Sequence, residues 1–279
     1  MLSYQHEYHA GNHADVLKHA VLALAIRAMQ RKDKPLRVFD AHAGSGRYDL
    51  AAREAARHAE HAGGIARVLA APDRPAVLDP DLAAVRACNP GGGQRYYPGS
   101  PAIARHALRP DDHLVLMELH PRALAALRRT FRGDRQVHVH GRDCAEGLPA
   151  LVPPPERRGL VLVDPAYEVK ADFAGVADLL AACHRRWPGG VYLAWYPLIR
   201  DRESERFPGR VAGLGIRRIY HAVLEVAARG TLGLRGSGLC IVNPPFGLDS
   251  ELGVLLPWLW ETLSVDGSGG WHAGWLVPE

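Results

Sequence analysis

The feature that most constrains the fold of this chain is a regular alternation between short apolar runs and helical segments. Runs typical of buried strands lie at residues 36–40, 113–117, 136–140, 159–163 and 191–195. Helical segments that begin near Pro121, Cys144 and Lys170 separate the later runs. Strands that alternate with helices usually pair in parallel, because each helix carries the chain back across the sheet. The pattern therefore predicts an α/β fold with a doubly wound, mainly parallel sheet.

Segments on either side extend this arrangement. Asn12 is expected to cap a helix over residues 13–31, whose apolar residues recur at helical spacing. Further strands are predicted at about 216–226 and 238–242, followed by a helix over 250–263.

Residues 50–95 interrupt the alternation. Their short helical pieces are rich in Ala, Arg and His, and they are broken by Gly63-Gly64, by several prolines and by a Gly-rich run after Asn89. No run there has the spacing of a strand. We therefore expect a single domain over residues 1–279 with a small helical subdomain inserted at residues 50–95.

The composition is typical of a globular protein without a membrane segment. Hydrophobic residues make up 47% of the chain and charged residues 23%. The most apolar stretch, residues 16–29, contains Lys18, His19 and Arg27, which favours a core helix over a membrane span. The first residues lack the charged-then-apolar layout of a secretory signal. We expect a cytoplasmic protein that has no membrane partner and acts as a monomer.

Neither the cysteines nor the histidines follow a common metal-binding pattern. The cysteines are far apart and include no CxxC pair, so reduced thiols are expected: Cys88, Cys144, Cys183 and Cys240. The histidines near the N-terminus match no common zinc spacing: His6, His9, His13 and His19. No metal is predicted.

The charge balance mildly favours a polyanionic partner. The net charge is +4, and only four of the 34 basic residues are lysines. Arginine suits bidentate phosphate contacts and stacking on bases. A coding sequence rich in G and C explains the same bias, and the composition does not separate the two. The Arg128, Arg129, Arg132 and Arg135 group is likewise either an RNA contact or a solvated helix face.

Candidate ligand-binding residues follow the first two strands of the parallel set. Ligands of doubly wound sheets bind beyond the carboxyl ends of the strands. Gly44 and Gly46 allow a tight turn and close approach of a ligand, although the spacing is not the dinucleotide fingerprint GxGxxG. Glu118 ends the second strand, where an acidic residue commonly accepts hydrogen bonds from ribose hydroxyls. A solvated strand end is the alternative for Glu118.

Asp143 follows the third strand, and Cys144 comes directly after it. An aspartate followed by a small residue at this place can bind the exocyclic amine of an adenine. Asp143 as a plain helix N-cap fits the local sequence equally well.

The fourth strand ends in Asp164-Pro165-Ala166-Tyr167, which resembles the Asp-Pro-Pro-Tyr signature of adenine-N6 methyltransferases. The N6 lone pair is delocalised into the purine ring and is a poor nucleophile. Hydrogen bonds from the amino group to the Asp164 carboxylate and the Pro165 carbonyl stabilise charge that develops on nitrogen. Tyr167 offers a face on which an extruded base can stack, and Asp164 can accept the released proton. A plain Asp-Pro turn is the alternative.

A second run, Asn243-Pro244-Pro245-Phe246, looks similar and has both prolines. It follows the last predicted strand, whereas the ligand crevice lies beside the first and fourth strands. We interpret it as a structural turn.

The whole chain resembles the 23S ribosomal RNA adenine-N6-methyltransferases of the RlmJ type. The resemblance rests on Leu2-Ser3-Tyr4, on the block from His9 to His19, and on further short motifs. These are His42-Ala43-Gly44, Arg95-Tyr96-Tyr97-Pro98-Gly99-Ser100-Pro101, Glu118-Leu119-His120-Pro121, Trp195-Tyr196-Pro197 and Trp275-Leu276-Val277-Pro278-Glu279.

The resemblance implies a class I, Rossmann-like methyltransferase fold with the helical insertion. It implies transfer of a methyl group from S-adenosyl-L-methionine to one adenine N6 of 23S ribosomal RNA, leaving S-adenosyl-L-homocysteine, without a metal. It implies that Asp164 is the proton acceptor and that Tyr4 contacts substrate RNA, with Lys18 as a phosphate or cofactor contact. The implied cofactor-site residues are His19, His42, Ser100, Glu118, Asp143, Cys144 and Asp164, which join Gly44 and Gly46.

One departure from the family pattern concerns the motif itself, because Ala166 stands where the family has a second proline. The groups needed for chemistry remain, but the loop loses rigidity and gains a backbone N–H that needs a partner. Three alternatives stay open: an adenine methyltransferase acting on DNA, a methyltransferase acting on a protein glutamine amide, and a catalytically silent RNA-binding relative.

Overall fold

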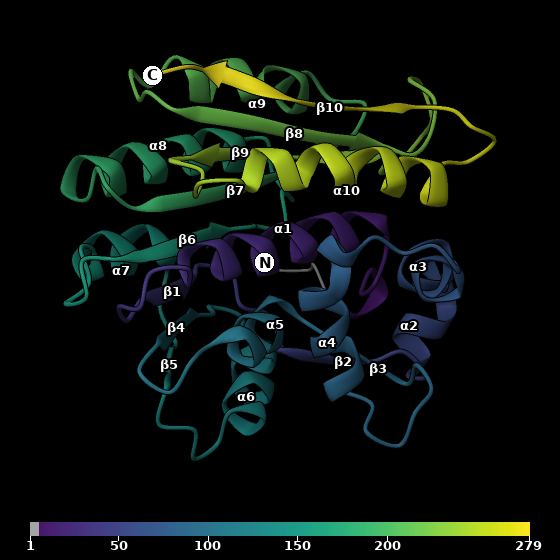
Figure 1. Cartoon of the computed structure of the whole chain (residues 1–279), viewed down its shortest axis with the longest axis horizontal. Helices are drawn as coiled ribbons and strands as arrows, with labels where there is room; N and C mark the ends of the chain where they lie inside the picture. Colours follow the sequence, from purple (N-terminus) through teal and green to yellow (C-terminus); the bar gives the residue numbers. More distant parts are fainter. Residues whose placement is uncertain (1–5) are drawn as a thin grey trace.

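An eight-stranded sheet forms the centre of the protein, in the order β10-β8-β9-β7-β6-β1-β4-β5 (Figure 1). The computed structural model describes residues 6–279, and for residues 54, 56 and 57 only the backbone. The strands are β1 (Arg37–Asp40), β4 (His113–Met117), β5 (Val137–His140), β6 (Gly159–Val163), β7 (Val191–Leu198), β8 (Ile219–Glu225), β9 (Gly236–Val242) and β10 (Gly270–Val277). Strands β5, β4, β1, β6 and β7 are parallel neighbours, whereas β9, β8 and β10 pair antiparallel. The predicted mainly parallel sheet is confirmed.

Helices cover both faces of this sheet (Figure 1). One layer contains α1 (His13–Met29), α5 (Ser100–Ala107), α6 (Pro121–Thr130) and α10 (Leu248–Leu263), and the other contains α7 (Cys144–Leu151), α8 (Ala171–Arg186) and α9 (Arg202–Ala212). Alternate residues of each strand face opposite layers, so Val38 packs with α1 while Phe39 packs with α8. Among the helices of residues 6–279, none combines the length and apolar character needed to cross a membrane.

Helix α1 is buried on nearly all sides, because α4, α5 and α10 cover it where it lies on the sheet. The side chain of Asn12 caps its first turn by accepting hydrogen bonds from the N–H groups of Ala14 and Asp15, as the sequence predicts for this residue. Three polar side chains, Asp15, Lys18 and His19, are thereby carried into the interior. Buried charges are costly unless they are paired, so their partners define the site.

A separate two-stranded antiparallel ribbon joins β2 (Arg47–Asp49) to β3 (Tyr96–Pro98). The intervening residues form α2 (Arg53–His58), η2 (Glu60–Gly63), α3 (Ile65–Ala70), η3 (Ala76–Leu78) and α4 (Asp79–Ala87). A further short helix, η1 (His6–Tyr8), precedes α1. The sequence favours a helical segment directly after the glycine-rich turn at Gly44 and Gly46, and this expectation is wrong because β2 occupies that place.

Candidate active site

A cavity of about 840 Å³ opens at the carboxyl ends of the parallel strands. The loops that follow β1, β4, β5 and β6, the end of β7, and the buried face of α1 form its wall. A cavity of this size is typical of a small-molecule site. The wall contains most of the predicted site residues: Lys18, His19, His42, Gly44, Ser100, Glu118, Asp143, Cys144, Asp164, Pro165 and Tyr167.

Two predicted residues are not part of this described wall. Gly46 is buried beneath the turn, where a Cβ would lie 3.1 Å from side-chain atoms of Leu127 and Phe131. Its φ of +78° suits glycine, so the structure gives it a role in shaping the turn. Tyr4 lies outside the described residues.

The turn after β1 is held by Glu118. Its two carboxylate oxygens accept hydrogen bonds from the N–H of Gly44, at 2.8 Å, and from the N–H of His120, at 2.7 Å. Each oxygen keeps a further lone pair that can accept a hydroxyl donor. Glu118 therefore joins the first two loops of the cavity and still faces its interior as an acceptor.

His42 links the loops that follow β1, β5 and β6. Its Nδ1 accepts a hydrogen bond from the backbone N–H of Asp164 at 3.3 Å, and its Nε2 lies 3.4 Å from Cys144 Sγ. Burial lowers the pKa of the ring to about 4. A neutral ring whose Nδ1 accepts must carry its proton on Nε2. His42 thus fixes the backbone beside Asp164 without adding charge.

Asp143 both caps α7 and lines the cavity. Its carboxylate accepts a hydrogen bond from the N–H of Ala145 at 2.8 Å. The two interpretations of this residue are therefore compatible, because one oxygen satisfies the helix and the other remains available.

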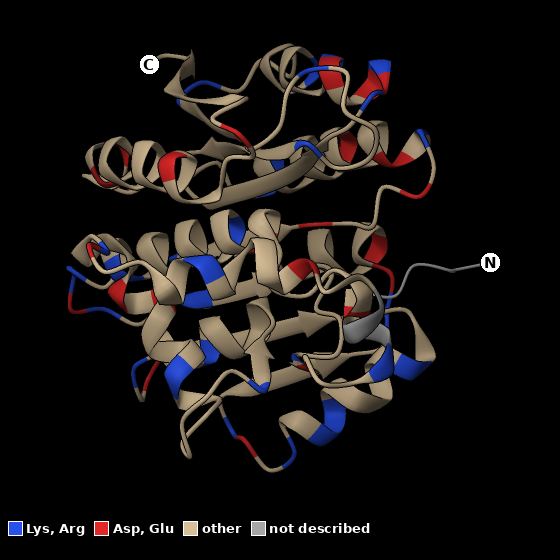
Figure 2. Ribbon diagram, turned by 90° about the vertical axis from the view of Figure 1, so that its right-hand side faces the viewer, with Lys and Arg blue, Asp and Glu red and all other residues tan. Residues whose placement is uncertain are grey.

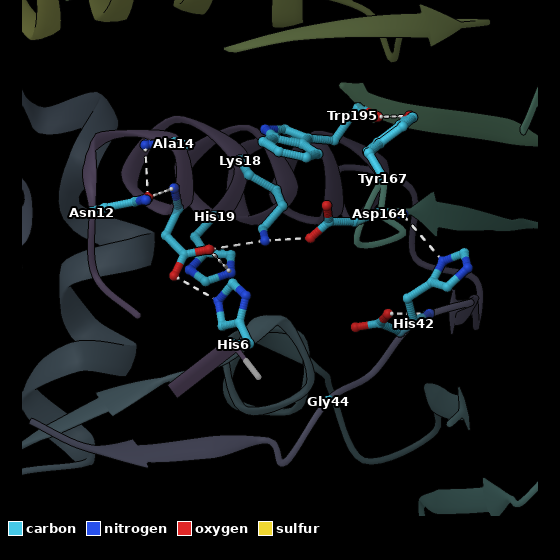
Figure 3. Close-up of polar contacts among 12 residues, drawn as sticks. His6, Asn12, Ala14, Lys18, His19, His42, Gly44, Asp164, Tyr167 and Trp195 are labelled. Carbon is cyan, nitrogen blue, oxygen red and sulfur yellow. Dashed lines mark hydrogen bonds and ion pairs between the residues drawn. The ribbon is translucent and has the colours of Figure 1, made fainter. Parts of the chain in front are cut away.

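Lys18 connects two carboxylates that come from distant parts of the chain (Figure 3). Its Nζ lies 2.9 Å from Asp15 Oδ1 and is also hydrogen-bonded to Asp164 Oδ2. Burial alone would lower the pKa of the ammonium, but the two carboxylates outweigh burial and raise that pKa above its usual value. Lys18 is only 3% exposed. A direct RNA phosphate contact by Lys18 is therefore disfavoured, and its partner is Asp164.

The second carboxylate of this cluster, Asp15, was not predicted as a site residue. Burial would raise its pKa, but the charges of His6 and Lys18 hold it well below the usual value. His6 Nε2 lies 2.9 Å from Asp15 Oδ2, which also accepts the N–H of Gly11. The spacing of Asp15 and Lys18, three residues apart on one helix face, was the available signal.

His19 and Ser100 form a neutral part of the wall. His19 Nδ1 lies 2.9 Å from the Tyr97 hydroxyl, and burial lowers the pKa of the imidazole to about 3. Asp40, beside Ser100, has a pKa raised to about 6 by burial. The His19 ring and the Ser100 hydroxyl can therefore hydrogen-bond to a ligand while the His19 ring stays uncharged.

In the loop after β6, Tyr167 is held by contacts with Trp195 and Phe173. Tyr167 has a φ of +51°, a conformation that is uncommon for a residue with a side chain. Its hydroxyl donates to the carbonyl of Trp195 at 2.6 Å, and its ring centroid lies 4.4 Å from that of Phe173. Because Tyr167 is 9% exposed, little of the ring is open in this structure, and stacking of a base on it stays a prediction.

Trp195, in the second half of β7, is another wall residue that was not predicted for the site. The Lys18 ammonium lies 5.6 Å from its ring centroid, within range of a cation–π interaction. In the sequence, Trp195 is the last residue of the predicted strand over 191–195, and this position was the signal for it.

The similar run at Asn243 lies elsewhere. Strand β9 is antiparallel to β7, so the residues after β9 lie beside the start of β7, at the opposite edge of the sheet from the cavity. Asn243 Nδ2 donates to the carbonyls of Pro188 and Gly190 there. The geometry supports its interpretation as a turn.

Neither a basic stripe, in the view of Figure 2, nor a metal-binding cluster marks the part of the molecule that the structure describes. Lys and Arg alternate with Asp and Glu along the helices and loops in the view of Figure 2, so the basic residues there are not confined to one stripe. Across residues 6–279, no group of three or more His, Cys, Asp and Glu side chains is arranged to hold a metal ion.

The chain is similar to known proteins along most of its length. Residues 33–277 match the family described as "Ribosomal RNA large subunit methyltransferase D, RlmJ". Two proteins called "Ribosomal RNA large subunit methyltransferase J" are similar along the full length of both chains, one from Escherichia coli at 42% identity and one from Haemophilus influenzae at 39%. A crystal structure from Legionella pneumophila has a TM-score of 0.87 at 31% identity, covering 95% of this chain and 97% of that one.

Proposed function

Because the chain belongs to the RlmJ family of ribosomal RNA large subunit methyltransferases, we propose that it methylates the exocyclic N6 of one adenine in 23S ribosomal RNA. The observation that carries the choice of N6 is the position of Asp164 and Pro165 in the cavity wall, with Asp164 held by Lys18. A carboxylate and a neighbouring carbonyl are the acceptors that an amino group with two N–H donors requires.

The cavity fits S-adenosyl-L-methionine as the methyl donor. Gly44 lines the cavity in the turn after β1, where a Cβ would collide with the Tyr48 hydroxyl, and Glu118 faces the same space as an acceptor for hydroxyl groups. In this proposal the second oxygen of Asp143, whose first oxygen caps α7, accepts a hydrogen bond from the amine of the cofactor's adenine ring. When bound, this cofactor supplies an electrophilic methyl group on a sulfonium centre.

Asp164 has two roles in the proposed reaction. As an acceptor it orients the N6 lone pair and stabilises the positive charge that develops on nitrogen. The new N–CH₃ bond replaces one N–H bond, and the carboxylate accepts the released proton before it passes to solvent. Lys18 is a positioning residue here, since it holds the carboxylate in the cavity and touches Asp164 rather than the base.

Methyl transfer to candidate substrates tests this function. The purified protein is incubated with tritium-labelled S-adenosyl-L-methionine and with 23S ribosomal RNA, duplex DNA or ribosomal protein. We expect label in the RNA alone, and mass spectrometry of the digested RNA should identify N6-methyladenosine at one position. Label at another atom or in DNA would overturn the N6 ribosomal RNA assignment, and absence of any transfer would favour a silent relative.

A further inference from the structure

The loop between β8 and β9, residues 226–235, stands at the rim of the cavity. Both of its ends are fixed, because the carbonyl of Arg235 accepts from the N–H of Val226 and the guanidinium of Arg235 contacts Glu225 and the carbonyl of Ile199. The carbonyl of Leu234 also accepts a hydrogen bond from the His13 ring at 3.3 Å. The base of the loop is therefore anchored to the sheet and to α1.

The tip of this loop presents an apolar side chain to solvent. Gly230 and Gly233 have φ values of +99° and +85°, and the turn they flank leaves Leu232 82% exposed. The next two residues, Gly233 and Leu234, line the cavity. A large aliphatic side chain with so much exposed surface contributes little to the core, so its position beside the cavity is what distinguishes it.

Basic side chains lie on the loops around the same rim. Lys170 follows the cavity residue Val169, Arg200 follows the cavity residue Ile199, and Arg229 lies in the β8–β9 loop itself. All three are exposed, and two of them also lie near carboxylates, Lys170 at 3.6 Å from Asp201 and Arg229 at 3.9 Å from Glu225. A rim with cations around one protruding aliphatic residue suits a nucleic acid, whose phosphates the cations attract and whose bases offer an apolar stack.

We propose that Leu232 is a wedge that enters the base stack of the RNA at the place vacated by the target adenine. The inference rests on the proposed function, since a base buried in a helix must leave its stack before its N6 can reach Asp164. An aliphatic side chain that fills the gap keeps the neighbouring bases from closing it and holds the target in the cavity. Leu232 is thus a positioning residue for substrate rather than a catalytic one.

Two RNA fragments separate a wedge from a merely structural residue. The first carries the mapped adenine of 23S ribosomal RNA within its native hairpin. The second is identical except that the nucleotide on the 3′ side of the adenine is abasic, which removes a stacking partner. Single-turnover methylation is measured on both with the wild-type protein and with Leu232→Ala, Leu232→Met and Phe246→Ala. Phe246 is a matched control, because it is 90% exposed but lies at the opposite edge of the sheet.

We expect Leu232→Ala to slow methylation of the native fragment about tenfold. On the abasic fragment, its methylation rate should lie within about twofold of the wild-type rate. Leu232→Met should retain the wild-type rate, and Phe246→Ala should match wild type on both fragments. Equal rates for Leu232→Ala and wild type on the native fragment, or the same defect on both fragments, would overturn the wedge. If the wild-type protein methylates no adenine, the proposed function fails first and the wedge fails with it.

Discussion

The ammonium of Lys18, in the first long helix, is ion-paired with the carboxylate of Asp164, which lies 146 residues further along the chain. Lys18 is buried and Asp164 is partly buried, and the same ammonium also contacts Asp15. The chemistry proposed for Asp164 therefore depends on Lys18. This lysine lies in α1, far in sequence from the motif at residues 164–167.

Replacing Asp164 by asparagine should lower kcat by roughly 10²-fold or more, because the amide neither accepts a proton nor stabilises positive charge on N6. The rate is measured with 23S ribosomal RNA under saturating cofactor. Circular dichroism of the variant should match wild type. Unchanged turnover would remove Asp164 from the mechanism.

Replacing Lys18 by methionine should destabilise the protein by about 3–5 kcal/mol, because the buried Asp15 and the partly buried Asp164 then lose their shared cation. Urea unfolding measures the loss. Adding Asp15→Asn to Lys18→Met should recover part of it, since one unpaired charge is removed. Lys170→Met is the matched control, since this lysine is 80% exposed and little change is expected. A double variant no more stable than the single one would contradict the cluster.

His42 should make the stability of the protein depend on pH. Burial lowers its pKa from 6.5 to about 4, so between these values the unfolded chain binds a proton that the folded chain does not. The free energy of unfolding therefore falls as the pH drops through this window, by about 3 kcal/mol in total for this group. Urea unfolding at about pH 7 and about pH 5 should show a smaller difference for His42→Gln than for wild type. Equal differences would rule out a buried neutral His42.

Asp81, in the inserted helices, should destabilise the fold above neutral pH. It is buried, neither carboxylate oxygen has a hydrogen-bond partner within the described residues, and burial raises its pKa to about 7. Because the folded chain holds the proton to higher pH than the unfolded chain does, stability falls as the pH rises from about 4 to about 7. Asp81→Asn should gain about 1–3 kcal/mol at about pH 8, measured by urea unfolding. Asp73→Asn, at an exposed loop position, is the control. A loss of stability in Asp81→Asn would contradict the prediction, because it would mean that the Asp81 carboxylate has a stabilising partner.

Replacing Glu118 by alanine should weaken binding of S-adenosyl-L-methionine by about tenfold or more, since hydrogen bonds to a charged acceptor and the tether on Gly44 are lost together. Isothermal titration calorimetry measures the affinity. Glu261→Ala removes an exposed glutamate of α10 and should bind as wild type does. Equal affinity of the Glu118 variant would exclude Glu118 from the cofactor site.

The central sheet was predictable because β1, β4, β6 and β7 contain apolar runs between helices, and buried parallel strands require that pattern. The edge strand β5 alternates Val and His instead. Strand β10 was not predicted, since its glycines and exposed tryptophans give no such run. It forms through pairing with β8 and contact with α10. Helix α9 was missed as well, and Pro208 inside it is a residue that normally argues against a helix.

The site was predictable where residues follow strand ends, because the carboxyl ends of parallel strands meet at one edge. Glu118, Asp143 and Asp164 are examples, and all three line the cavity. The pairing of Lys18 with Asp164 was not predictable from local spacing. It depends on how α1 lies across the sheet, which only the tertiary structure determines.

The placement of α1 has a consequence for the order in which the enzyme matures. This helix is made among the first segments, yet it packs against α10 and β9, which are made among the last. During synthesis, α1 is therefore made before α10 and β9, the elements that complete its packing. A nascent chain that already contains Asp164 therefore still lacks α10, and the helix that carries Lys18 is fully packed only when α10 docks on it.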